Sequence, residues 1–209
     1  MKLSVCIPCH INHADHLKNI LSDLSIQTKK PHEVVIFLKP FLSSNLNFLH
    51  GQFDETELKI ITSCEESTMG FAKNKCAEQS SGDILCFMDA DDRIHPQKLE
   101  FVEKIFTSKT CDAMIHNYSM NNVSIFNKTL DNPLIGNCFD HVTGTGVDND
   151  LDIPLHFAHC SVKKDVYLLN KFNENWDSYR ADDAYFVKSL CKKGYSVKCV
   201  DLKLISFTK

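Results

Sequence analysis

The amino-acid sequence predicts an α/β protein with a mostly parallel central sheet flanked by helices. Short apolar runs rich in β-branched residues recur along the chain up to His116, and segments with apolar residues at helical spacing separate them. Such strand–helix alternation brings successive strands into a parallel sheet. The chain has 209 residues and 43% hydrophobic content, which suffices for one domain, residues 1–209, with a core of its own.

The first strand is expected over the apolar run LSVCIP, which ends at Pro8. Asn12 is then a good N-cap for a helix. The buried face of this helix consists of apolar residues at helical spacing, Leu17, Ile20, Leu21 and Leu24. His10 therefore falls in a strand-to-helix loop at the carboxyl end of a strand, which is the edge where open α/β sheets bind ligands.

The next elements repeat this alternation. Asp83–Asp89 is the most continuous apolar run, so we expect it to form a central strand. The other strands are expected over Glu33–Leu38, Leu58–Ser63 and Asp112–His116, with helices over about 70–80 and from Pro96 onward.

The second half is less regular. The segment YSMNNVSIF indicates a hairpin with Asn121-Asn122 at its turn. Residues 131–155 are rich in Asn, Asp and Gly and are expected to form a long loop of a functional or mobile kind. A helix over Ala181–Lys193 and a strand within YSVKCVDLKLISF complete the expected fold.

The motif Cys6-x-x-Cys9-His10 has the spacing used to attach c-type haem. Haem attachment takes place after export, and the N-terminus lacks the apolar core of a signal peptide. A zinc site through Cys9 and His10 is likewise the less favoured interpretation, because a buried strand followed by a loop explains the same residues.

Composition excludes several classes of function. A net charge of -4 provides no broad basic field, so nucleic acid is not an expected partner. No window approaches about 18 uninterrupted apolar residues, so no transmembrane segment is expected. The ten cysteines are scattered through apolar runs and are expected to be reduced core thiols of a soluble, cytoplasmic protein.

Two acidic clusters carry the strongest chemical signal. Asp89, Asp91 and Asp92 close the central strand, and carboxylates this close repel one another unless a cation relieves them. Mg²⁺ and Mn²⁺ suit such oxygen ligands; the alternative is a solvated turn in which Asp92 caps the next helix. Asp182 and Asp183 open the late helix, either as complements of its dipole or as a general base.

The segment MGFAKNK lies between these clusters. Gly70 permits close backbone approach, and Lys73 and Lys75 are cations near a helix N-terminus that could receive a phosphate. A solvated helix start explains the same residues.

Taken together, these segments resemble the family 2 glycosyltransferases, which have the GT-A nucleotide-diphospho-sugar transferase fold. The opening strand, loop and helix, the block GFAKNKCAEQSSGDILCFMDADD with its DxD motif, and the block RADDAYFVKSLCKKGYSVKCV occur in the family's order over most of the chain. The resemblance implies an inverting enzyme with a nucleotide-sugar-binding half, residues 1–116, and an acceptor-side half, residues 117–209.

The resemblance also implies roles for single residues. Asp89 and Asp91 match the DxD motif that holds Mn²⁺ or Mg²⁺ and contacts the donor's ribose and diphosphate. Asp183 matches the catalytic base, with Asp182 where the family usually has Glu. The remaining donor-binding residues are implied to be Pro8, His10, Gly70, Lys73 and Asn74.

One departure concerns the nucleotide. The family usually has Asp-Asp-Gly-Ser after the second strand, and its acid contacts the base, whereas this chain has Leu38-Lys39-Pro40. A UDP-sugar is the expected donor, and the acceptor, whether glycan, lipid or protein, is left open. His156 and His159 are interpreted as packed or solvated histidines rather than as metal or acceptor contacts.

Two other functions remain as alternatives. A haloacid-dehalogenase-type phosphatase would use Asp89 as nucleophile, Asp91 as acid and Asp182-Asp183 as Mg²⁺ ligands, although its motif usually closes the first strand. A non-catalytic module would bind a nucleotide sugar, or a partner protein, without turnover.

Overall fold

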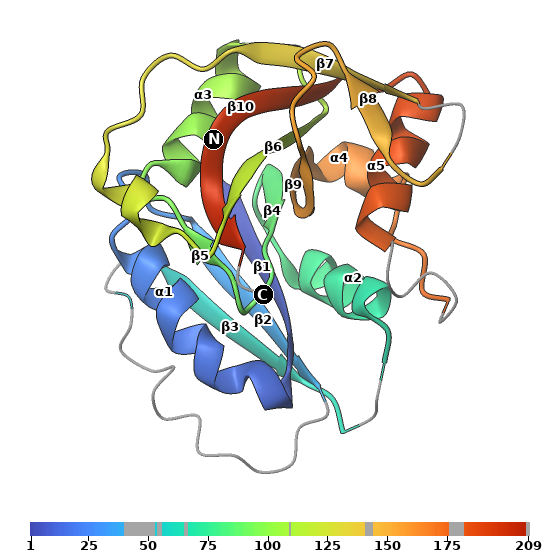
Figure 1. The fold of residues 1–209 in the computed structure, drawn as a ribbon. Coiled ribbons are helices and arrows are strands. Elements are labelled where there is room, and N and C mark those ends of the chain that lie inside the picture. Colours follow the sequence, from blue (N-terminus) through green and yellow to red (C-terminus); the bar gives the residue numbers. More distant parts are fainter. Residues whose placement is uncertain are drawn as a thin grey trace.

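A computed structural model describes residues 1–39, 53, 56–64, 67–108, 110–140, 144–175 and 182–207. Within these residues, ten strands form one sheet with the order β3-β2-β1-β4-β9-β6-β10-β7-β8, and the short β5 pairs with β10 (Figure 1). Strands β1, β2, β3 and β4 pair in parallel, as expected from the alternating first half. The predicted α/β class with helices flanking a central sheet is confirmed.

The parallel strands occur close to the predicted ranges. They are β1 (Leu3–His10), β2 (Glu33–Lys39), β3 (Glu57–Thr62), β4 (Ile84–Phe87) and β6 (Ala113–Met120). Strand β4 is buried along its whole length, as the continuous apolar run predicts. The long β10 (Val197–Phe207) pairs in parallel with β6 and antiparallel with the two-residue β5 (Arg93–Ile94).

Helices cover both faces of the sheet. The helices α1 (Leu17–Ser25) and α3 (Lys98–Ser108) pack into one apolar cluster, and α2 (Met69–Gln79), α4 (Lys164–Leu168) and α5 (Asp182–Lys192) pack into a second cluster on the opposite face (Figure 1). Because strand side chains alternate between faces, β1 contributes Val5 and Ile7 to the first cluster and Cys6 to the second. All ten cysteines are free, and eight of them are buried, as expected of core thiols.

The start of the first helix differs from the prediction. A 3₁₀ helix, Ile11–His16, precedes α1, and its N-cap is His10 rather than Asn12. The imidazole of His10 accepts a hydrogen bond from the backbone N–H of Asn12 at 3.2 Å. His10 is thus held at the carboxyl end of β1 by the turn that follows it.

The predicted hairpin at Asn121-Asn122 is wrong. Strand β6 continues to Met120, Asn121 turns with φ 47°, and a 3₁₀ helix, Val123–Asn127, follows. Strand β6 lies between β9 and β10, so both of its edges are already paired and no hairpin partner can join it.

The predicted long loop over 131–155 is also wrong in part. It contains the antiparallel pair β7 (Ile135–Asp140) and β8 (Val147–Asn149), while residues 141–143 lie outside the described part. The sequence analysis also missed β9 (His156–Lys163), which runs antiparallel between β4 and β6. Its inner residues alternate little in polarity because both faces are covered.

Candidate functional site

The polar ends of several strands meet at one edge of the sheet. Strand β1 ends at His10, Asp89 comes two residues after β4, and β6 and β10 end at Met120 and Phe207. Strand β9 begins at this edge with His156, because it runs in the opposite direction. The topology therefore gathers side chains from both halves of the chain where α/β sheets bind ligands.

A first cavity at this edge, which we call the carboxylate cavity, has a volume of about 210 Å³. Its lining is Pro8, Cys9, His10, His13, Met69, Asp89, Ala90 and Asp91. The structure thus brings together Pro8, His10 and both acids of the DxD motif, although they lie about 80 residues apart in the chain. The thiol of Cys9 donates to the carbonyl oxygen of His10, and burial raises its pKa to about 12, which does not suit a zinc ligand.

The two DxD carboxylates have different surroundings. Asp91 is 37% exposed, and its Oδ2 lies 3.7 Å from Nδ1 of His13. Burial raises the pKa of Asp89 to about 7; the Lys73 ammonium opposes this shift, and the carboxylates of Asp183 and Asp91 reinforce it. An ionised Asp89 therefore lacks compensation within the protein.

This donor set fits a hard divalent cation. Carboxylate oxygens are the ligands preferred by Mg²⁺ and Mn²⁺. Asp89 and Asp91 line the carboxylate cavity, and the Lys73 ammonium is shared by Asp89, Asp182 and Asp183. A cation at the exposed Asp91 and the neighbouring Asp89 would relieve the excess of negative charge.

A buried ion-pair network links α2 to the start of α5. Nζ of Lys73 lies 3.0 Å from Oδ2 of Asp182 and also contacts Oδ1 of Asp183. Burial alone would lower the pKa of Lys73, but Asp183 and Asp182 outweigh it, and the pKa is raised. Lys73 is only 1% exposed and its ammonium is paired with these acids, so it orients them, and its expected contact with the donor stays a prediction.

Asn74 and Gly70 likewise contact other parts of the protein. The Asn74 side chain accepts hydrogen bonds from the Tyr167 hydroxyl and the Phe172 amide at 2.5 and 3.1 Å. It donates to Phe172 O and Glu174 Oε1 at 3.0 and 2.6 Å. All of its polar capacity is used within the protein, which gives Asn74 a structural role, and its expected contact with the donor stays a prediction.

Gly70 also contacts the segment 172–174, and we call the contacts of Asn74 and Gly70 with this segment the clamp. A Cβ atom at Gly70 would overlap the carbonyl oxygen of Asn173. The glycine is therefore needed for close approach, as predicted, but the approaching group is protein backbone rather than a ligand. Gly70 and Asn74, four residues apart on α2, thus both fix the chain that leads toward the second acidic pair.

A second cavity of about 300 Å³ lies beside the first, and we call it the aromatic cleft. Its lining is Asp89, Tyr118, Leu155, His156, Phe157, Ala158, Asp183, Ala184 and Phe207. Asp89 borders both cavities, so they meet at this residue. Asp183 lines the cleft, whereas the 4% exposed Asp182 lines a separate pocket on the other side of α5. Asp182 is thus a partner of Lys73 on a different side from the cleft, and the catalytic roles expected for Asp182 and Asp183 stay predictions.

A buried polar network supports the turn that carries the acids. Lys98 Nζ lies 3.0 Å from Nε2 of His116 and 2.7 Å from Nδ1 of His159. Nε2 of His159 lies 2.9 Å from Oδ2 of Asp92, so Asp92 is tied into the core rather than capping α3. Burial lowers the pKa of Lys98 to about 7 and, with Lys98, holds the pKa of both histidines well below their usual range.

The three residues Asp92, His156 and His159 offer ligand atoms within 4.8 Å of one another. Hydrogen bonds to Lys98 and Asp92 already use both ring nitrogens of His159. His159 is therefore a packed histidine, as predicted. His156 lines the aromatic cleft, and burial lowers its pKa to about 4, which keeps the ring neutral.

Comparison with known proteins identifies the family. The family model of glycosyl transferase family 2 matches residues 4–162. The chain belongs to glycosyl transferase family 2. The match confirms the predicted family and the glycosyltransferase class of enzyme that goes with it. No curated protein matches the chain.

Solved structures similar to this family 2 domain have the same fold. TarS 1-349 of S. aureus in complex with UDP is 16% identical with a TM-score of 0.76, over 100% of this chain and 61% of that chain. The same protein in complex with UDP-GlcNAc gives the same identity and TM-score, with 59% of that chain covered. The mannosyltransferase PcManGT of Pyrobaculum calidifontis, in complex with GDP-Man and Mn2+, is 16% identical with a TM-score of 0.68, over 100% of this chain and 56% of that one.

The predicted GT-A fold is therefore confirmed, and the haloacid-dehalogenase alternative does not apply to a family 2 domain. The chain spans about 60% of the length of the TarS 1-349 structures that it matches. Among the described residues, no helix is long and apolar enough to span a membrane.

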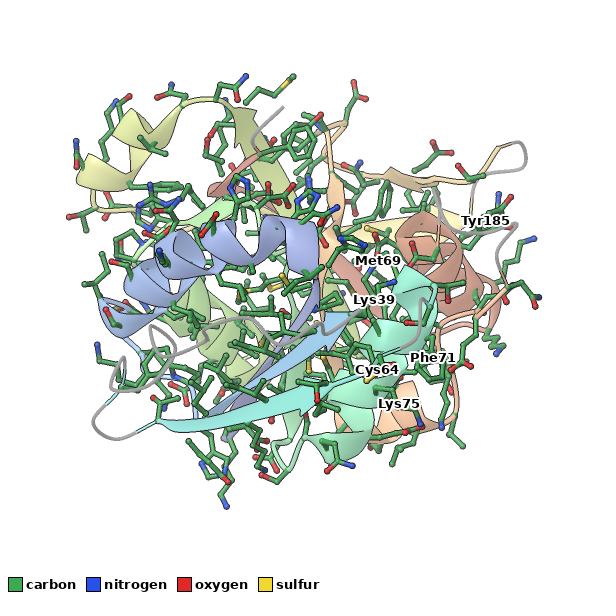
Figure 2. The ribbon with its side chains drawn as sticks, turned by 90° about the horizontal axis from the view of Figure 1, so that it is seen from below. Lys39, Cys64, Met69, Phe71, Lys75 and Tyr185 are labelled. Atoms are coloured by element: carbon green, nitrogen blue, oxygen red, sulfur yellow. The ribbon has the colours of Figure 1, made fainter. Side chains whose placement is uncertain are left out.

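The family's base-contacting acid is replaced here by a buried lysine. Lys39 ends β2 beside His10 and is 1% exposed, and its Nζ donates to the carbonyl oxygen of Ser67, ahead of α2. Figure 2 labels Lys39 and Met69 in this region, with Phe71 and Lys75 further along α2 and Tyr185 on α5. Lys75 pairs with Glu78 and lies over the Phe71 ring, so it is a solvated helix residue. Pro40 lies outside the described residues.

Proposed function

We propose that this family 2 domain transfers a sugar, with inversion, from a nucleotide-diphosphate donor to an acceptor hydroxyl. One observation carries the proposal: Asp89 borders both the carboxylate cavity, which contains Asp91, and the aromatic cleft, which contains Asp183. A donor in the first cavity and an acceptor in the second would meet at Asp89. The described lining of the first cavity comes from residues 8–91, and that of the second, apart from Asp89, from residues 118–207, which supports a donor half and an acceptor half.

The donor is proposed to be a UDP-sugar held in the carboxylate cavity by Pro8 and His10 and through a cation. The neighbouring structures in complex with UDP and UDP-GlcNAc support this class of donor, and the one in complex with GDP-Man and Mn2+ makes a GDP-sugar the comparison to test. Asp91 and Asp89 would hold Mn²⁺ or Mg²⁺. When bound, such a cation stabilises negative charge that develops on a leaving diphosphate.

The chain's own residues carry the acceptor chemistry. Asp183 accepts the proton of the acceptor hydroxyl, whose oxygen forms a bond to C1 of the donor sugar on the face opposite the diphosphate. The bond from C1 to the diphosphate oxygen breaks, and its electron pair leaves with the diphosphate. Lys73 holds Asp183 in place, because the Lys73 side chain is buried and also forms an ion pair with Asp182. Fixing both substrates in line lowers the entropic part of the barrier.

A thermal-shift and turnover experiment tests this function. The chain is mixed with UDP-, GDP- and CDP-sugars, with Mn²⁺ or with EDTA, and release of nucleoside diphosphate is then measured. We expect one nucleotide class, UDP, to raise the melting temperature in a metal-dependent way, and the Asp91→Ala variant to lose that shift. Equal shifts with EDTA, or in Asp91→Ala, would remove the metal role. Donor binding without any turnover would favour the non-catalytic module.

A further inference from the structure

The aromatic cleft contains more ring side chains than proton transfer at Asp183 needs. Its walls carry four rings, those of Tyr118, His156, Phe157 and Phe207. We propose that the acceptor is a neutral carbohydrate whose pyranose-sized ring stacks in this cleft. This inference rests on the proposed function and names the substrate class of the same site.

Three of the rings form one angled wall, in which the Tyr118 and His156 planes are inclined at 68° and those of His156 and Phe207 at 48°. The centroids of Tyr118 and His156 lie 5.4 Å apart, and those of His156 and Phe207 also lie 5.4 Å apart. These rings come from three neighbouring strands, β6, β9 and β10, at the edge where Met120 pairs with Phe207. Aromatic faces carry negative charge density and attract the positive C–H groups on one face of a sugar ring.

Polar groups at the edge of the wall suit hydroxyls. The carboxylates of Asp183 and Asp89 line the same cleft and can accept from them. Nδ1 of His156 is buried and has no hydrogen-bond partner among the described residues. A buried nitrogen without a partner costs about 1–3 kcal/mol, and because His156 lines the cleft, a turn of its ring would offer this nitrogen to a bound hydroxyl.

Charge argues against phosphate-bearing lipid acceptors. The described lining contains two carboxylates and no lysine or arginine. The nearby cations, Lys73 and Lys98, are buried and already bonded to Asp182, Asp183 and the two histidines. A prenyl phosphate would therefore meet carboxylates and no basic side chain of the described lining.

Size argues against a peptide. Small-molecule pockets range over roughly 300–1,000 Å³, and a cleft of about 300 Å³ lies at the lower end of this range. It accommodates one ring together with its hydroxyls, whereas an extended peptide needs a longer groove. A sugar ring has an apolar face surrounded by hydroxyls, and the cleft has rings beside carboxylates. A glycoside is therefore the ligand that fits the cleft best.

The test is an acceptor panel run with the nucleotide sugar that stabilises the protein, in the presence of Mn²⁺. Its arms are p-nitrophenyl glycosides of common hexoses, a serine- and threonine-containing peptide, and a farnesyl phosphate dispersion. Transfer to at least one glycoside, and to neither of the other classes, is the expected result. Transfer to the peptide or to farnesyl phosphate alone, or to none of the probes while the donor is hydrolysed, would overturn the inference.

Ring variants sharpen the test. Phe207→Ala and Tyr118→Ala should raise the acceptor KM by about 2- to 10-fold, whereas the thermal shift caused by the donor should persist. Phe207→Leu and Tyr118→Leu also remove the rings and are the milder forms if the alanine variants fold poorly. Phe139→Ala removes a 48% exposed ring on β7, outside the cleft, and is the matched control. An unchanged acceptor KM in all four cleft variants would overturn the inference.

Failure of the inference and failure of the proposed function have different signatures. If no nucleotide sugar shifts the melting temperature or is hydrolysed, the transferase function itself fails. If donor binding and hydrolysis persist but glycosides are refused, only the carbohydrate acceptor is lost.

Discussion

The carboxylate cavity and the aromatic cleft share Asp89 but are built from different parts of the fold. The carboxyl end of β1 and the residues that follow β4 supply most of the first cavity, and its chemical character comes from carboxylates and histidines. The second is walled mainly by rings near the ends of β6, β9 and β10. The carboxylate cavity is suited to a charged ligand, and the aromatic cleft to a ligand with an apolar face.

This difference predicts how each region responds to change. Loop acids can be altered with little effect on packing, so their loss should appear in binding or chemistry. Residues that hold the two regions together, such as Lys73 and Gly70, do not belong to the described lining of either cavity. Their loss should appear first in stability.

The largest effect is expected from Asp183→Asn. The amide cannot take a proton from the acceptor, so transfer should fall by about 10²- to 10⁴-fold while donor binding persists. Steady-state transfer and donor-induced thermal shift measure the two quantities. Asp182→Asn serves as the contrast: it should destabilise the protein but retain much more activity. Equal loss of kcat in both variants would remove the distinction between the two acids.

Next in size is Lys73→Met. Removing this cation leaves buried carboxylates without compensation, which should lower the free energy of unfolding by about 3–5 kcal/mol. Urea denaturation at pH 7 measures it. Lys75→Met, on the same helix, removes an exposed pair with Glu78 and should change stability by only about 0–1 kcal/mol. Similar losses in the two lysine variants would contradict the buried network.

A smaller effect is expected from Gly70→Ala. The new methyl group would overlap the Asn173 carbonyl, and overpacking costs about 1–3 kcal/mol. Because the displaced segment leads toward Asp182 and Asp183, kcat should fall together with the melting temperature. Gly146→Ala is the matched control, since its Cβ would meet only a Phe157 carbon at an ordinary 3.9 Å. A Gly70→Ala protein as stable and as active as this control would argue against the clamp.

The smallest effect concerns pH. Burial and Lys98 hold the pKa of His116 well below its usual range, so the folded protein excludes a proton that the unfolded chain binds near about pH 6.5. This contribution to stability is present above that pH and is lost below it, at up to roughly 1.4 kcal/mol per pH unit. His116→Gln should flatten the fall in stability between pH 7 and pH 5, as measured by urea denaturation. The exposed His16→Gln is the control, and an unchanged slope in His116→Gln would refute the assignment.

Patterns in the sequence were most informative where local chemistry and topology agree. The strand ending at His10 and the acids after β4 could be predicted, because each sits at a strand end whose apolar run is continuous. The roles of Gly70, Lys73 and Asn74 could not. A buried lysine or asparagine next to a helix start has the same local pattern as one that faces a ligand, and only the distant partners Asp182 and Phe172 distinguish them.

The second half was harder to predict for a different reason. Strand β9 is covered on both faces and follows a polar stretch, so its residues show no clear period. The signal available was the run Phe157–Val162, short and interrupted by His159 and Ser161. His159 faces Lys98, more than sixty positions earlier, and that pairing is invisible in a single sequence.

The position of β9 limits where the chain can be divided into fragments that fold. A strand from the later half is inserted between β4 and β6 of the earlier half, so neither piece can close its own sheet. A fragment that stops after β6 would leave one edge of β4 and both edges of β6 without a partner, and such edges are open to aggregation. Engineering of this scaffold therefore has to keep β9 together with its neighbours β4 and β6.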